Sequence, residues 1–370
     1  MTLGRIAAIC FCIVITSAVA AGQQRSDTAN QGPQGPARSV IERTYDAGDL
    51  APWRRVQTRS ESSGREVVVE TSEVPDAEGR LAPFHETVME TIRSAPNTTQ
   101  TRHDVFGFAP DRRRRLVETT ESLRETQANG DTSAVHNTWA PDLNGRLGLT
   151  SRQTEETRSA APDVRQTDTT LLMPGLNETL RETERTEYTE RRLNPGVVRH
   201  DSTHLVRDVN GRWQPIETRR GEAREIGASE RMEEETIQRR DMNGKLAVEE
   251  KTVTRRSNAN KQEHVVIETY APYVDGLPRS NIGLALSQRV HRTTTATADG
   301  GRYIVEEVEG LSPVAPNDPM RVIRRTVTTV RQIGTDRWVT ERQVFERDIE
   351  GRLRLVINET EEKTGASPLR

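Results

Sequence analysis

The chain has 370 residues, and 53 Lys and Arg stand against 56 Asp and Glu, so the formal net charge at pH 7 is only −3. This balance excludes the cationic surface that a nucleic-acid-binding protein needs, and no nucleic-acid partner is expected. Hydrophobic residues make up 32% of the sequence, against roughly 45–50% in an average soluble domain, which excludes a large apolar core. The density of Thr, Val and Ile favours strands over disorder.

Residues 1–20 have the features of a secretory signal peptide: a basic residue, a short apolar run and the small residues of 18–20. The run is too short for a confident membrane span, and an uncleaved anchor is the alternative. Cys10 and Cys12 both lie here, so the mature chain is expected to lack cysteine, disulfides and thiolate metal sites. We predict a bacterial protein, secreted or periplasmic, that does not span a membrane after signal cleavage.

Residues 21–39 are rich in Gln, Gly and Pro and are predicted to form a flexible linker. Residues 40–53 are compatible with a short strand or a helical turn. From about residue 54, turn signals recur roughly every 16 residues, which leaves about 11–12 residues for each strand. Residues 40–365 are therefore predicted to form one repetitive array with about 33 residues per two strands, and residues 366–370 a loose tail.

One pattern recurs along this array: Asp, any residue, Asn or Glu, Gly, a base and an apolar residue. Its copies begin at Asp76, Asp142, Asp208, Asp241 and Asp348, with a degenerate copy at Asp299. Asn-Gly between extended segments is the strongest short-range hairpin signal. Because Glu tolerates positive φ poorly, the copies with Glu favour a type I turn followed by a left-handed Gly over a two-residue type I′ loop. The Asp side chain then accepts backbone N–H groups two residues on.

This three-residue loop fixes which residues face each other across a hairpin. It predicts that Phe345 pairs with Leu355 and that Glu235 faces Lys251, pairs that contribute roughly 0.2–1 kcal/mol each. If Phe345 faced Val356 instead, the loop would have two residues.

The segments between turns carry Glu, Arg and Thr on both faces, as residues 178–188 illustrate. A helix is the alternative for residues 115–127 and 177–193 because Glu, Leu and Arg favour helices, but the Thr content and the turn spacing favour strands. We predict an all-β fold, a long antiparallel meander of tandem β-hairpins whose sheet is open, curled or closed. Backbone ladders and Glu–Arg pairs replace an apolar core, and an insertion suggests an internal break at residues 276–300.

Few residues are candidates for chemistry. His200 and His204 share one strand face but lie too far apart for one metal ion, so no metal site is predicted. The basic run at 112–115 suits an anionic glycan or phosphate, although a solvated turn is favoured. Trp213 and Trp338 each follow a basic turn residue. They suggest a sugar-stacking row, but the mixture of residue types at this place favours apolar plugs beside the turns.

Catalytic residues stay unassigned, because Asp and Glu occur throughout and mark no single pair. No nucleophile elbow, zinc-binding helix, phosphate-binding glycine loop or calcium loop is found in the sequence, and no cofactor is expected. An outer-membrane barrel is disfavoured because most strands lack the apolar face that lipid requires.

The leading hypothesis is therefore a β-repeat protein, secreted, periplasmic or at the cell surface, with a structural, adhesive or binding role. Its expected partner is a polysaccharide, a cell-envelope component or another protein, and an open sheet would also associate edge to edge. The alternative is a secreted carbohydrate-active enzyme with two carboxylates on the sheet face near residues 277–300.

The Asp-x-x-Gly-Arg-Leu turn is similar to the tip of the YD-type repeats in large bacterial shell-forming toxins. Those repeats carry a Tyr before the Asp, where this sequence has Arg207, Arg240 or Arg347, and their period is shorter. The resemblance covers the turn alone and implies no function.

Overall fold

The computed structural model describes residues 37–364 except 47–52, 110, 176, 178, 273–282, 312–318, 335–336 and 349. The chain divides into two units, residues 1–35 and residues 36–370, and every described residue belongs to the second. The predicted signal peptide, most of the predicted linker and the predicted tail lie outside the described residues and stay predictions.

The described residues form twenty β-strands and no helix. The strands are β1 (Ala37–Asp46), β2 (Trp53–Ser62), β3 (Arg65–Pro75), β4 (Leu81–Ala95), β5 (Thr98–Phe108), β6 (Arg114–Thr126), β7 (Thr132–Pro141), β8 (Leu147–Ala161), β9 (Val164–Pro174), β10 (Leu180–Asn194), β11 (Val197–Arg207), β12 (Trp213–Gly227), β13 (Glu230–Arg240), β14 (Leu246–Ala259), β15 (Gln262–Pro272), β16 (Leu284–Ala296), β17 (Arg302–Gly310), β18 (Arg321–Gln332), β19 (Arg337–Arg347) and β20 (Leu353–Thr364). The two segments for which a helix was the alternative lie mainly in β6 and β10, so their Thr residues and turn spacing predicted the structure correctly. None of the described residues belongs to a helix long and apolar enough to cross a bilayer.

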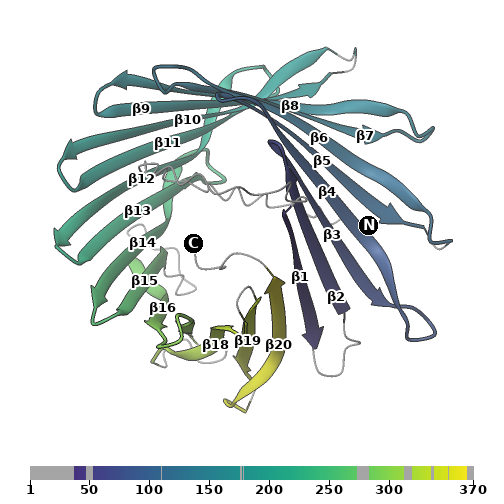
Figure 1. Cartoon of the computed structure of the whole chain (residues 1–370). Helices are drawn as coiled ribbons and strands as arrows, with labels where there is room; N and C mark the ends of the chain where they lie inside the picture. The colour runs from purple at the N-terminus through teal and green to yellow at the C-terminus, as the bar shows by residue number, and fades with distance from the viewer. Residues whose placement is uncertain are drawn as a thin grey trace, which may run out of the picture. The chain divides into compact units, whose positions relative to one another are not determined.

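Consecutive strands pair antiparallel along the whole described array, from β1–β2 to β19–β20 (Figure 1). β1 also pairs with β20, with Ile41 opposite Lys363 and Asp46 opposite Asn358. Each of the twenty described strands therefore has a hydrogen-bonded neighbour on both sides, and the meander forms a closed ring. The predicted all-β meander is confirmed. Edge-to-edge association loses its basis, because no described strand has an unpaired edge.

The turns after odd-numbered strands lie at one end of the strands, which we call the Asp rim after Asp76, Asp142, Asp208, Asp241 and Asp348. At Asp208, the Gly211 N–H donates to the Asp208 carbonyl and the Asp208 N–H donates to the Arg212 carbonyl, each at 2.9 Å. Gly211 has a φ of 77°, and Asp208 Oδ1 accepts the N–H groups of Asn210 at 2.8 Å and Arg212 at 2.9 Å. This is the predicted three-residue loop, in which only Gly adopts a left-handed conformation.

The predicted register holds next to the loop and fails further along the strand. Phe345 faces Leu355, but Glu235 faces Thr252 instead of Lys251, because Glu249 bulges out of the pairing between β13 and β14. A bulge shifts all later pairs by one residue. Every hairpin from β3–β4 to β19–β20 that closes at the Asp rim contains such a shift.

The turns after even-numbered strands form the opposite rim and are mostly shorter. Between β2 and β3 only Ser63 and Gly64 intervene, and the Gly64 carbonyl accepts the N–H of Arg93 at 2.9 Å, which ties this turn to β4. The degenerate copy of the turn pattern lies here, and Thr297 takes the first place instead of Asp299. The Thr297 N–H donates to the Gly301 carbonyl at 3.0 Å.

Both faces of the sheet carry charged side chains, because residues two apart on a strand share a face. Among the described residues, no large side chain is completely buried. The buried apolar residues are distributed over many strands: Val68, Ala134, Ala223, Ile237, Val253, Val265, Val330, Trp338, Val339 and Val344. Glu–Arg rungs such as Arg65–Glu90 at 2.6 Å and Arg331–Glu341 at 2.6 Å join neighbouring strands. Backbone ladders and ion pairs thus hold the sheet together in place of a core, as the composition predicts.

Candidate functional site

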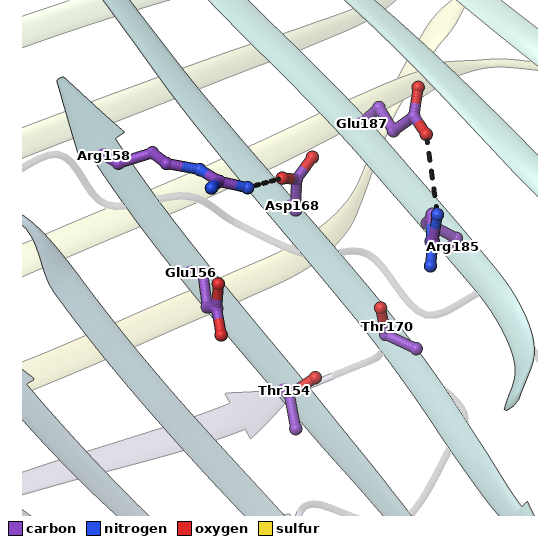
Figure 2. Close-up of a pocket in the computed structure, with 7 residues that line it drawn as sticks. All are labelled: Thr154, Glu156, Arg158, Asp168, Thr170, Arg185 and Glu187. Atoms are coloured by element: carbon purple, nitrogen blue, oxygen red, sulfur yellow. Dashed lines mark hydrogen bonds and ion pairs between the residues drawn. The ribbon is translucent and has the colours of Figure 1, made fainter. Parts of the chain in front are cut away.

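An ionic hollow of about 300 Å³ lies on β8, β9 and β10 (Figure 2). Its lining consists of Thr154, Glu156, Arg158, Asp168, Thr170, Arg185 and Glu187. The strand pairing places these side chains in adjacent rows on one face. Glu156 is opposite Asp168, which is opposite Glu187, and Thr154 is opposite Thr170, which is opposite Arg185.

The charges in the ionic hollow are unevenly paired. Arg158 Nη2 donates to Asp168 Oδ2 at 2.8 Å, and this hydrogen bond raises the pKa of Arg158 above its usual range. The ion pairs of Arg185 are long, 3.8 Å to Glu182 and 4.0 Å to Glu187, and its guanidinium also lies 5.4 Å from the ring of Trp213. Glu156 forms no salt bridge with any described residue and stands apart from both guanidinium groups in Figure 2, although its charge contributes to the raised pKa of Arg158.

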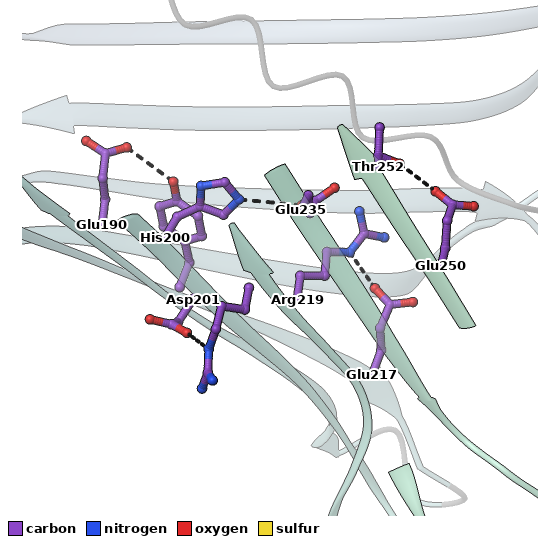
Figure 3. Close-up of polar contacts among 10 residues, drawn as sticks. Glu190, His200, Asp201, Glu217, Arg219, Glu235, Glu250 and Thr252 are labelled. Carbon is purple, nitrogen blue, oxygen red and sulfur yellow. Dashed lines mark hydrogen bonds and ion pairs between the residues drawn. The ribbon is translucent and has the colours of Figure 1, made fainter. Parts of the chain in front are cut away.

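A second group, the histidine cluster, consists of Tyr188, Glu190, His200 and Glu235 on the other face of β10–β13 (Figure 3). His200 Nε2 lies 3.5 Å from Glu235 Oε1, and its ring stacks on Tyr188 with the centroids 6.1 Å apart. The Tyr188 hydroxyl donates to Glu190 Oε2 at 3.2 Å. The ring of His200 covers Gly221, where a Cβ atom would lie 2.2 Å from it.

The protonation of this cluster follows from these contacts. Burial raises the pKa of Tyr188 to about 12, and the charge of Glu190 adds to the shift. The hydrogen bond to Glu235 raises the pKa of His200 against the opposing effect of burial. The same bond lowers the pKa of Glu235. The pair is therefore an imidazolium–carboxylate pair over a wider pH range than isolated groups would give.

Next to this cluster, Glu217 is held by two cations. It accepts from Arg219 Nε at 2.6 Å and from Arg239 Nε at 2.7 Å. Burial opposes its ionisation, but the two guanidinium groups outweigh that effect and hold the pKa of Glu217 below its usual range. These residues have satisfied partners, which is the arrangement of a structural network and not of a general base.

The two histidines that the sequence singled out share a face, as predicted, and contact different carboxylates. His200 lies near Glu235, whereas His204 Nε2 lies 3.2 Å from Glu184 Oε2. Within the described ranges, no group of three or more His, Cys, Asp or Glu is arranged to hold a metal ion.

The basic run at 112–115 spans the end of a turn and the start of β6, and three of its four cations have carboxylate partners. Arg112 Nη2 contacts Asp76 Oδ2 at 2.7 Å, and Arg114 Nη2 contacts Glu86 Oε1 at 2.6 Å. Paired cations are poorly placed to bind an anionic glycan or phosphate, so the solvated turn remains the better interpretation.

The apolar residues that follow the basic turn positions differ in environment. Trp338 is 7% exposed and acts as the predicted plug. Trp213 lies between Arg207 and Arg185, whose Cζ atoms are 4.9 and 5.4 Å from its ring. Leu81 and Leu147 are exposed, so the plug interpretation is wrong for them, because each lies next to the rim with no second layer above it.

The stretch proposed to hold catalytic carboxylates does not supply a pair. Residues 277–300 contain a single carboxylate, Asp299, and it lies in a turn of the opposite rim, where its Oδ1 accepts the Gly301 N–H at 3.4 Å. Residues 277–282 lie outside the described residues.

Sequence reasoning missed the ionic hollow. Every strand has the same mixture of Thr, Glu and Arg, so Glu156, Asp168 and Arg185 carry no distinguishing signal. Counting from the loop at Gly175 places Thr186 opposite Asp168. The bulge within β10 places Glu187 there instead, and no sequence feature marks that bulge.

No protein-family model matches this sequence, and no curated protein matches it. Solved structures resemble it in fold. The siderophore receptor PirA from Pseudomonas aeruginosa is 9% identical over 91% of this chain and 82% of its own, with a TM-score of 0.45. OccK3 (OpdO) of Pseudomonas aeruginosa is 12% identical over 89% and 95%, with a TM-score of 0.48. The copper transporter OprC is 7% identical over 91% and 82%, with a TM-score of 0.49. At these values the likeness concerns the fold alone.

The prediction of a protein free in the medium or the periplasm is wrong. The neighbours that contradict it are outer-membrane β-barrel receptors and porins.

Proposed function

We propose that this chain is a cell-surface binding protein whose ionic hollow takes a small zwitterionic solute. The observation that carries the proposal is the unequal pairing within the hollow: Glu156 has no ion-pair partner among the described residues, and Arg185 is held only at 3.8 and 4.0 Å. An ammonium group suits the first residue and a carboxylate suits the second.

The size of the hollow selects the ligand class. Glu156 and Arg185 are on strands two apart, β8 and β10, which lie roughly 10 Å from each other across the sheet. A ligand whose opposite charges are separated by several bonds, such as a dipeptide, spans this gap better than a compact ion. Thr154 and Thr170 line the same hollow, and their hydroxyl groups can hydrogen-bond to the amide of a dipeptide ligand.

The affinity is expected to be weak. The lining charges are largely exposed, and exposed pairs contribute only about 0–1 kcal/mol each. A dissociation constant on the order of 1 mM, equivalent to about −4 kcal/mol, is therefore expected. Both faces of β8, β9 and β10 carry charged side chains, so we place these three strands in water and not in lipid.

Titration of the protein with alanyl-alanine, followed by two-dimensional NMR or calorimetry, tests the proposal. We expect saturable binding that weakens at least threefold in Glu156→Gln and in Arg185→Gln. N-acetyl-alanyl-alanine amide lacks both charges and serves as the ligand control.

The matched protein control is Arg220→Gln. This residue pairs with Asp201 at 2.8 Å on the same face, two strands beyond the hollow. Its removal should leave the titration unchanged. Binding that is indifferent to Glu156 and Arg185, or equally lost in the control, would refute the assignment of the hollow.

A further inference from the structure

The loops of the Asp rim hold apolar side chains fully out in solvent. Leu143, Val209 and Met242 occupy the position after the Asp, and their relative exposures are 106%, 101% and 104%. The sequence places Ile349 at the same position of another copy. A single exposed apolar side chain is ordinary, but its recurrence at the same position of three loops on one rim is a feature that the contacts within the fold do not explain.

A free base accompanies each of these three side chains in the same loop. Arg146, Arg212 and Lys245 form no ion pair with any described residue, and the Asp carboxylate of each loop is occupied by backbone N–H groups. In the loops with Glu, the base is neutralised instead: Arg80 contacts Glu78 and Arg352 contacts Glu350. The Asn-Gly loops therefore combine a fully exposed apolar tip with a basic side chain that has no ion pair.

The strand ends beside the Asp rim extend this apolar character. Exposed large apolar residues gather within a few positions of its loops, among them Leu81, Phe84, Val117, Leu147, Leu246 and Leu355. Phe84 and Val117 are the bulged residues of their strands. A bulge redirects a side chain relative to its neighbours. The opposite rim has mostly small or polar residues in its described turns, such as Pro96-Asn97 and Asn260-Lys261, and fewer exposed apolar residues, among them Leu193, Ile226 and Ile333.

We propose that the Asp rim rests on a lipid surface with anionic headgroups, with Leu143, Val209 and Met242 inserted among the acyl chains and Arg146, Arg212 and Lys245 against the phosphates. Apolar tips flanked by bases are the pattern of proteins that bind at a bilayer interface. The tips are separated by at least two strands, roughly 10 Å, so they form separate points instead of one continuous patch. A fluid lipid surface has no fixed pockets, so it can take up separate apolar side chains at any spacing.

A second copy of the chain is a poorer occupant. Two Asp rims placed face to face would bring the unpaired bases of one against those of the other, while Oδ1 of each loop Asp accepts backbone N–H groups of its own loop. Like charges at such a contact oppose association. An anionic lipid surface has the complementary charge. This proposal is independent of the ionic hollow, which lies away from the rim on β8–β10.

Vesicle flotation of the full chain tests the proposal. Vesicles of phosphatidylcholine alone are compared with vesicles that contain one quarter phosphatidylglycerol. We expect more than tenfold stronger binding to the anionic vesicles. The triple variant Leu143→Asn, Val209→Asn, Met242→Asn should lose it, and so should Arg146→Gln, Arg212→Gln, Lys245→Gln. Neither set touches a folded contact, which circular dichroism verifies.

The matched control replaces exposed apolar residues of the opposite rim, Leu193→Asn with Ile226→Asn, and should bind as the parent does. A second measurement locates the contact independently of the apolar N-terminal run that all variants share. Brominated lipids should quench a tryptophan introduced as Met242→Trp and spare one introduced as Ile226→Trp. Equal quenching at both rims, unchanged flotation of the triple variants, or a vesicle-free dimer that they abolish would each overturn the proposal.

Discussion

The two rims of the closed sheet satisfy the backbone hydrogen-bonding groups of their turns in different ways. At the Asp rim, a three-residue loop satisfies its own backbone through the Asp side chain, as Asp142 does for Asn144 and Arg146 at 2.7 and 2.9 Å. At the opposite rim, short turns use the neighbouring strand, as when the Gly196 carbonyl accepts the Glu225 N–H at 2.8 Å. A loop whose backbone N–H groups are hydrogen-bonded within the loop makes no demand on the side chains at its outer positions. The Asp rim can therefore vary at its tips, whereas the opposite rim is constrained by contacts with the sheet.

The largest expected effect comes from the constrained rim. In Gly301→Ala the new Cβ would lie 2.1 Å from the Val330 carbonyl oxygen, so the backbone must move, at a cost of about 2–3 kcal/mol. Gly79→Ala at the Asp rim meets no atom within 4 Å and costs only the left-handed conformation, about 1 kcal/mol. Urea unfolding followed by circular dichroism compares the two. Equal losses would mean that the rims do not differ in packing.

A smaller loss is expected from the Asp that defines the other rim. Asp241 Oδ1 accepts the N–H groups of Asn243 at 2.9 Å and Lys245 at 2.8 Å, so Asp241→Ala should destabilise by about 1 kcal/mol. Asp241→Asn keeps an acceptor and should retain most of the stability. Asp299→Ala at the opposite rim removes a weaker bond and should cost less. The order of the three melting temperatures decides the outcome.

Between the rims, stability should depend on pH through the histidine cluster. The pKa of His200 is raised by Glu235, so its contribution is complete below the unfolded value of about 6.5 and is lost as pH rises through the higher folded pKa. The pKa of Glu235 is lowered. Its contribution to stability is therefore present above its unfolded pKa and is lost only in acid, as pH falls through the folded pKa. The effect should be under about 1 kcal/mol because both side chains are partly exposed. Melting temperatures should fall between pH 6 and pH 8.5, and His200→Gln should flatten that profile; an unchanged slope in the variant would contradict it.

The smallest change in stability is expected within the Asp rim itself. Asn144→Glu gives Arg146 the partner that Arg80 has in Glu78. An exposed pair should alter the free energy of unfolding by less than about 0.5 kcal/mol. Binding to anionic vesicles should nevertheless weaken, and the reverse exchange Glu78→Asn should strengthen it. A change in melting temperature without a change in flotation would contradict this separation of stability from docking.

The predictable part of the fold is the local part. The Asp-x-Asn-Gly loops follow from four neighbouring residues, and the structure forms them with the bonds that Asp and Gly dictate. The arginine before the Asp also gains an explanation: Arg240 Nε donates to the Gly244 carbonyl at 3.1 Å. An arginine there reaches the turn, which accounts for the departure from the Tyr of YD-type repeats.

What the sequence did not predict depends on bulges and on closure. One unpaired residue, Glu249, was enough to put Glu235 opposite Thr252, and a similar shift assembled the ionic hollow. The ring closes because β1 pairs with β20. This contact joins the two ends of the array, and no local sequence pattern encodes it. The candidate site therefore required the register of three strands, which residue types alone leave undetermined.

A ring in which every neighbour runs antiparallel has an arithmetic consequence. Chain direction must alternate all the way round, so only an even number of strands can complete it. Losing or gaining a single strand would leave either a parallel seam or two bare edges open to foreign chains. Evolution can therefore enlarge or shrink such a molecule only by whole hairpins. The unit of about 33 residues that the sequence predicts has this two-strand size.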